Sequence, residues 1–152
     1  MSNDGNEAYK FHEKCDNVGP TLTLIKANKD RIFGGFTPLS WKAEENDDNQ
    51  NPKFDDDNLT FIFSLNLSEK YDLFKDKKDK KVRAITCNSE EGPNFGNSDF
   101  VIFEPMIKGK VCSYENCSFF NDKNKSTLLG ENKNEIDSEF ETNEIEIFQV
   151  EY

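Results

Sequence analysis

The residues with the most reactive chemistry in this chain are an imidazole and a thiol near its start. His12 and Cys15 are three residues apart, so on a helix their side chains can face each other. An imidazole beside a thiol can take its proton and leave a nucleophilic thiolate. However, Cys15 shares one apolar helical stripe with Ala8 and Phe11, which favours a buried, unreactive thiol. A packed pair is therefore the preferred interpretation, and a thiol-dependent redox or hydrolytic enzyme using Cys15 and His12 is the alternative.

Metal ligands do not occur in a recognisable pattern. Cys112 and Cys117 have four residues between them, and neither a second cysteine pair nor a second histidine is present to complete a zinc site. Aspartates gather in one polar stretch, at Asp47, Asp48 and Asp55–Asp57. They lack the alternating spacing, central glycine and terminal glutamate of a calcium loop. We expect no metal or cofactor, and the aspartates are predicted to form a solvated acidic loop.

Charge excludes several classes of partner. The 152-residue chain has a formal net charge of −11, which opposes binding to nucleic acid and to acidic membranes. The basic run Lys75–Arg83 is expected to be a solvated loop, with a local anion contact as the alternative. No stretch reaches the ~18 apolar residues of a membrane span, and the N-terminus lacks the apolar region of a secretory signal. We expect a cytoplasmic location, reduced cysteines and no direct membrane insertion.

The element pattern is mostly that of short strands. A helix is predicted over 6–15 and a turn over 17–20. Loops are expected over 42–58, 90–98 and 123–126, with a further charged loop after residue 67. Strands are predicted over 21–26, 31–37, 59–67, 82–87, 100–103, 111–113, 117–119 and 144–152. Together they predict one domain of the mainly β (α+β) class, a two-sheet antiparallel β-sandwich with a few short flanking helices.

Several residues are expected to specify this sandwich. In 59–67, Leu59, Phe61, Phe63 and Leu65 alternate with smaller residues and are predicted to face the core. Asp57 is expected to pin the turn before that strand.

Other positions have a structural interpretation and a functional alternative. Gly34-Gly35 predicts a bulge or close packing in a strand, because a phosphate loop needs more glycines and a following helix. Trp41 is expected in the core, with an exposed interface anchor as the alternative. Phe95, between Gly92-Pro93 and Gly96, is predicted to anchor a turn-rich connector. The alternative is a shaped loop that touches a partner.

Read in order, the motifs of the chain resemble one family over residues 2–152. They are Phe11-His12-x-x-Cys15-Asp16-x-x-Gly19-Pro20-Thr21-Leu22, Phe33-Gly34-Gly35-Phe36-Thr37, Ser40-Trp41, Phe61-x-Phe63-Ser64-Leu65, Gly92-Pro93-x-Phe95-Gly96, Leu128-Leu129-Gly130 and Glu144-Ile145-Glu146-Ile147-Phe148-x-Val150. No single motif is specific, but seven in this order resemble the TLDc domain. The resemblance implies two packed antiparallel sheets.

The same resemblance implies a function. Family members are linked to oxidative-stress resistance and to binding the cytosolic sector of the vacuolar proton-pumping ATPase, and no catalytic residues are agreed for the family. It implies a non-catalytic protein-interaction module. Family domains usually begin with an apolar segment ahead of the stretch that is Ser2–Gly5 here. The chain 1–152 is therefore expected to lack that element and to show an unfilled groove or an exposed apolar patch.

Overall fold

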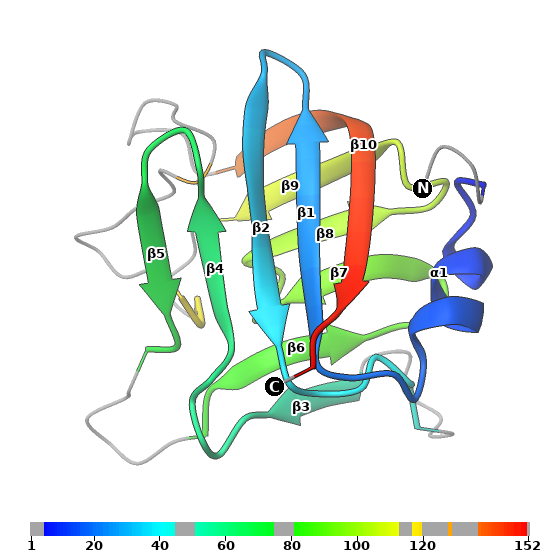
Figure 1. Cartoon of the computed structure of the whole chain (residues 1–152), viewed down its shortest axis with the longest axis vertical. Coiled ribbons are helices and arrows are strands. Elements are labelled where there is room, and N and C mark those ends of the chain that lie inside the picture. The colour runs from blue at the N-terminus through cyan, green and yellow to red at the C-terminus, as the bar shows by residue number, and fades with distance from the viewer. Residues whose placement is uncertain are drawn as a thin grey trace.

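The computed structural model describes residues 5–44, 51–74, 81–112, 117–119, 128 and 137–151 (Figure 1). It contains the helix α1 (Ala8–Cys15) and the strands β1 (Thr21–Ala27), β2 (Arg31–Thr37), β3 (Asn51–Phe54), β4 (Phe61–Ser64), β5 (Glu69–Asp72), β6 (Arg83–Cys87), β7 (Glu91–Phe95), β8 (Phe100–Phe103), β9 (Lys108–Cys112) and β10 (Asp137–Gln149). The mainly β class is confirmed. A single helix, rather than a few, lies within the described residues.

All the strands belong to one antiparallel sheet rather than to the two separate sheets that were predicted. The sheet has ten strands in the order β3-β6-β7-β8-β9-β10-β1-β2-β4-β5. β10 joins its halves, because residues 137–141 pair with β9 and residues 142–149 pair with β1. In Figure 1, β1, β2 and the end of β10 cross in front of β6 to β9. The long β10 strand thus continues from the rear layer into the front one.

The first hairpin forms as predicted. β1 and β2 pair without interruption from Thr21↔Thr37 to Ala27↔Arg31. Residues 28–30 form the turn, and within it Lys29 and Asp30 have φ of 59° and 54°, the left-handed conformation that short hairpin turns commonly contain. The predicted hairpin and its turn at 28–30 are confirmed.

A chain of aromatic rings fills the space between the layers. Neighbouring rings in this chain have centroids 4.8 to 5.7 Å apart, the range in which aromatic pairs add to burial energy. All six side chains are buried. In spatial order they are Phe11, Trp41, Phe95, Phe100, Phe33 and Phe140. The Phe-rich composition therefore supplies the core, and Trp41 belongs to it.

The strand predicted over 59–67 is shorter than expected, and its orientation was predicted wrongly. β4 covers only Phe61–Ser64. The core side carries Thr60, Ile62 and Ser64, and the outer side carries Leu59, Phe61, Phe63 and Leu65. The rings of Phe33 and Phe95 already occupy the interior, and Ser64 lies opposite Phe33 in the register. Small residues therefore suit the inner side of β4, and its aromatic residues lie outside.

Several predicted loops contain strands. β3 lies within 42–58, β5 within the charged loop after residue 67, and β7 within 90–98. β10 begins at Asp137, before the predicted start at 144, and ends at Gln149. Residues 117–119 contain no strand, and the predicted loop 123–126 lies outside the described residues. The missed strands are four or five residues long and polar or rich in turn residues, so their patterns lack apolar alternation.

Candidate interaction surface

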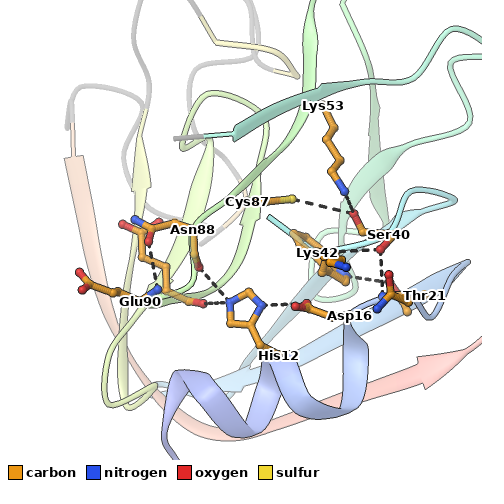
Figure 2. Close-up of polar contacts among 12 residues, drawn as sticks. His12, Asp16, Thr21, Ser40, Lys42, Lys53, Cys87, Asn88 and Glu90 are labelled. Carbon is orange, nitrogen blue, oxygen red and sulfur yellow. Dashed lines mark hydrogen bonds and ion pairs between the residues drawn. The ribbon is translucent and has the colours of Figure 1, made fainter. Parts of the chain in front are cut away.

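His12 clamps α1 to the turn between β6 and β7. Its Nδ1 lies 2.8 Å from Asp16 Oδ1, and its Nε2 lies 2.9 Å from the Asn88 carbonyl oxygen and 3.0 Å from that of Glu91 (Figure 2). Both ring nitrogens are thus directed at oxygen atoms. The structure gives His12 the geometry of a bridge between two segments and not that of a base aimed at the Cys15 thiol.

The two thiols that the structure buries are chemically quiet. Burial raises the pKa of Cys15 to about 11, and the neighbouring Asp16 carboxylate acts in the same direction. Burial also raises the pKa of Cys87 to about 11. Because the thiolate is the nucleophile, both groups are almost entirely unreactive near neutral pH. The predicted packing of Cys15 on the Ala8 and Phe11 stripe is confirmed.

Acidic residues in the β3–β4 connection have structural roles. Asp55 is buried and accepts hydrogen bonds from Thr60 N at 2.6 Å and Thr60 Oγ1 at 2.7 Å. It also accepts one from Asp57 N at 3.2 Å, so Asp55 pins this turn, in place of the predicted Asp57. Asp56 and Asp57 are exposed as expected, whereas 47 and 48 lie outside the described residues. Within those residues, no three His, Cys, Asp or Glu side chains group as metal ligands.

The basic run is only partly described. Its residues 75–80 lie outside the described ranges. Lys81 Nζ lies 3.1 Å from Asp56 Oδ1, and Arg83 Nη1 donates to Asn97 Oδ1 at 2.9 Å. The described end of the run therefore contacts side chains of its own domain.

Trp41 is a core residue, as predicted, and Ser40 fixes the segment that leads to it. The Trp41 indole is 1% exposed and donates from Nε1 to Thr21 Oγ1 at 3.0 Å. Ser40 Oγ accepts hydrogen bonds from Asn17 N at 3.0 Å and Lys42 N at 3.3 Å (Figure 2). The alternative of Trp41 as an exposed interface anchor is therefore wrong.

The two glycine motifs serve close packing. A Cβ on Gly34 would lie 2.0 Å from the backbone oxygen of Thr23, and one on Gly35 would lie 2.7 Å from the Phe95 ring. Phe95 is fully buried and stacks on Phe100 with centroids 4.8 Å apart. The predicted close packing at Gly34-Gly35 and the predicted Phe95 anchor are confirmed, although β7 replaces the expected irregular connector.

The feature that sequence reasoning misplaced is an apolar outer face on the front layer. Cross-strand register brings its residues into adjacent rows. One row runs Phe148, Leu22, Phe36, Phe61; the next runs Leu24, Gly34, Phe63; and a third pairs Lys26 with Ile32. Phe36 and Phe61 stack with centroids 5.5 Å apart. We call these side chains, with Leu59 and Leu65, the aromatic face.

The aromatic face is open to solvent within the described residues. Leu59, Leu65 and Phe148 are 48%, 55% and 46% exposed, and Phe61 and Phe63 are half-buried. A contiguous apolar surface on a monomer is typical of a protein-interaction site. The alternation of 59–67 could have revealed this face, had the pattern been assigned to the outside.

Charged residues border the aromatic face. Glu144, Glu146 and Asp72 lie at its margins, with Lys26 and Lys70 as counter-charges. Lys70 Nζ lies 4.5 Å from the centroid of the Phe61 ring and 2.6 Å from Asp72 Oδ1. The margin and the chain as a whole are therefore acidic, with the net charge of −11 dominating at longer range.

A second residue that sequence reasoning missed is Asp99. It is fully buried, and its Oδ1 accepts hydrogen bonds from the backbone N–H groups of Asn97 and Ser118, both at 3.0 Å. Its Oδ2 accepts one from Phe119 N at 2.9 Å. This carboxylate ties residues 117–119 to the β7–β8 turn, and it is structural because its oxygens are taken up by backbone donors.

Comparison with known proteins decides the family. The TLDc domain family matches residues 1–151. The chain belongs to the TLDc domain family. The resemblance drawn from the ordered motifs is thereby confirmed over essentially its whole length.

One curated relative of this TLDc domain is the MTOR-associated protein MEAK7 of Danio rerio. It is 39% identical over 51 residues, which are 34% of this chain and 10% of the relative. The alignment thus covers about a tenth of that protein's length.

The helix in the described residues, the eight-residue α1, is too short to span a membrane.

Proposed function

We propose that this TLDc domain is a non-catalytic interaction module that binds a protein through its aromatic face. The observation that carries the proposal is the row of half-exposed rings on β2 and β4, centred on Phe36 and Phe61. Aromatic residues, phenylalanine included, are enriched at the centres of protein interfaces, where a few residues carry most of the binding energy. The raised pKa values of Cys15 and Cys87 also favour binding over thiol chemistry.

The acidic margin favours a partner with a basic rim around an apolar patch. Complementary charge accelerates encounter and makes association sensitive to salt. The first candidate, from family membership, is the cytosolic sector of the vacuolar proton-pumping ATPase, with oxidative-stress resistance as the associated process. The name of the Danio rerio relative, an MTOR-associated protein, is a second indication that domains of this kind work with protein partners.

The test is binding of the full chain to the purified cytosolic sector, measured on a surface at two salt concentrations. Phe61→Ser should weaken binding by about tenfold or more, because it removes a ring from the centre of the face. Phe103→Ser is the matched control, since Phe103 is 37% exposed on β8 in the other layer. Higher salt should slow association and leave dissociation nearly unchanged.

A peroxide-consumption assay runs beside the binding assay. Failure to bind at micromolar protein, together with peroxide turnover that Cys→Ser variants abolish, would overturn the proposal in favour of the thiol enzyme. Equal weakening by Phe61→Ser and Phe103→Ser would show that binding does not use the aromatic face.

A further inference from the structure

Within the described residues, the half of β10 that belongs to the front layer has a free edge. β9 pairs with β10 only over residues 137–141, and β1 pairs with the other side over residues 142–149. In the described part of the chain, no strand adjoins the remaining side of residues 146–149. This edge differs from those of β3 and β5 because it lies in the interior of the strand order.

The hydrogen-bond register shows which backbone groups face this edge. Val150 N donates to the Pro20 carbonyl oxygen at 2.8 Å, so the residue pairs 150/20, 148/22 and 146/24 bond across the ladder. The N–H and C=O groups of Ile147 and Gln149 then point to the opposite side. These donors and acceptors have the spacing at which a further extended strand would form hydrogen bonds with β10.

A groove follows this edge. A hollow of about 400 Å³ lies between α1 and β10 and is lined by the four consecutive residues Glu146–Gln149. A separate, smaller hollow of about 240 Å³ is lined by residues 142–145 together with Met106 and Ile107. Lining by consecutive residues of a strand, and not by alternate ones, means that the groove runs along the backbone edge.

The walls of the groove restrict what can occupy it. Phe11, Cys15 and Val18 supply an apolar wall. Lys14 and Lys10, the latter paired with Glu13 at 3.4 Å, lie on the α1 side, and Glu146 lines the β10 side. In Figure 1, α1 stands beside β10. A second folded sheet would have to pass α1 to reach the edge, whereas a single extended segment is narrow enough to lie between them.

We propose that the groove accepts an extended segment of a partner protein, which adds to β10 as a further strand. Its backbone pairs with Ile147 and Gln149, and alternate apolar side chains cover Phe11 and Val18. An acidic side chain near the α1 side complements Lys10 and Lys14. Strand addition of this kind takes affinity from main-chain hydrogen bonds and selectivity from the side-chain pockets. The groove adjoins the aromatic face at Phe148. The proposal nevertheless rests on the backbone edge of β10 and does not depend on binding at that face.

The probe is an eight-residue acetylated peptide of alternating valine and threonine with one aspartate at its end. Amide hydrogen exchange of the full chain is followed residue by residue with increasing peptide. Exchange at Ile147 and Gln149 should slow at least tenfold at saturation, while the core amides of β1 stay unchanged. The control peptide has the same side chains but N-methyl groups on alternate amides, which removes the strand donors, and it should not protect.

A pair of variants at one position isolates the backbone contribution. Gln149→Pro removes the outward N–H at the end of β10 without removing a hydrogen bond to β1, and it should weaken peptide binding about tenfold. Gln149→Ala keeps that N–H and should bind like the parent protein, and Phe61→Ser should also bind normally. Near-ultraviolet circular dichroism checks that each variant is folded.

Three results would overturn the proposal. One is no change in exchange at Ile147 and Gln149 at millimolar peptide. Another is equal protection by the N-methylated peptide or in Gln149→Pro. The third is protection that rises with protein concentration without peptide, which would make the occupant a second copy of the chain. Unchanged binding of Phe61→Ser to the cytosolic sector would overturn the aromatic-face proposal and would leave these outcomes unaffected, so the two proposals fail separately.

Discussion

The ring of Phe63 lies over the backbone of Gly34 on the outer surface of the sheet. These residues are direct cross-strand partners, and a Cβ on Gly34 would come within 3.0 Å of Phe63 Cζ and 2.0 Å of Thr23 O. Phe63 is thus half-buried over a glycine rather than enclosed in the core. The ring covers backbone that a side chain at residue 34 would otherwise cover.

Gly34→Ala and Phe63→Ala should differ sharply in stability. The alanine Cβ at 34 meets backbone that cannot move without disturbing the β1–β2 pairing, so we expect a loss of about 3 kcal/mol or more. Phe63→Ala loses only half-buried contacts, and we expect less than about 2 kcal/mol, below the cost of a fully buried phenylalanine. Urea unfolding midpoints of the two variants measure this, and equal midpoints would contradict it.

The thiols of Cys15 and Cys87 should lose their protons only at high pH. Folding raises the pKa of Cys15 and Cys87 from the ordinary 9.0 to about 11, so the folded state holds these protons more tightly than the unfolded state. Their contribution to stability is therefore present below pH 9 and is lost as the pH rises from about 9 to 11. Alkylation of the native protein at neutral pH should modify Cys117, which is half-buried, before Cys15 or Cys87. Rapid labelling of Cys15 at neutral pH would contradict this.

Substitutions at Trp41 should measure how much the aromatic core contributes to stability. Trp41→Phe keeps most of the ring packing against Phe11 and Phe95 but removes the donor to Thr21 Oγ1, and we expect a cost of about 1–3 kcal/mol. Trp41→Ala leaves a cavity and should cost about 3–5 kcal/mol. Thermal unfolding followed by circular dichroism measures both. An exposed-type emission spectrum of the folded parent protein, whose single tryptophan is Trp41, would contradict the burial.

The sequence predicted those parts of the fold that local chemistry determines. The apolar stripe of α1 and the turn at Lys29-Asp30 depend on neighbours within a few residues, and both were predicted correctly. The orientation of β4 depends instead on its cross-strand partners, because the rings of Phe33 and Phe95 leave room only for Thr60, Ile62 and Ser64 inside. Alternation alone is symmetrical, so it cannot say which face is buried.

The contrast between local sequence and distant partners also explains why β3 and the edge of β10 were not predicted. β3 has the sequence Asn51–Phe54 and includes Pro52, which a strand at the edge of a sheet tolerates. Its partner β6 begins about thirty residues later, so no local pattern reveals it. The edge of β10 that is free within the described residues was likewise invisible, because it depends on where β9 begins, at Lys108, and on the placement of α1. Cys15 was predicted correctly since its burial follows from the helix stripe alone.

Replacing His12 should loosen the attachment of α1 and leave the packing of the sheet unchanged. His12→Ala removes the contacts to Asp16, Asn88 and Glu91, and we expect faster amide exchange in α1 and a cost of about 1–3 kcal/mol. Amide exchange in β1 and β2 should accelerate no more than the fall in the free energy of unfolding requires. Glu13→Ala is the matched control, because Glu13 lies on the exposed side of the helix, where it forms a surface ion pair with Lys10 at 3.4 Å. Uniform acceleration across the whole sheet would show that His12 is part of the core and not a local clamp.

Asp99 should be the most sensitive polar residue of the rear layer. Its carboxylate accepts backbone hydrogen bonds from Asn97, Ser118 and Phe119. Asp99→Asn is nearly isosteric but directs an NH₂ group at backbone donors, so at least one buried N–H loses its acceptor. We expect a loss of about 2–4 kcal/mol, measured by urea unfolding. Asp57→Asn is the control, because Asp57 is exposed, and it should change the midpoint little. If the two variants unfold at the same urea concentration, the three backbone bonds to Asp99 do not hold residues 117–119 in place.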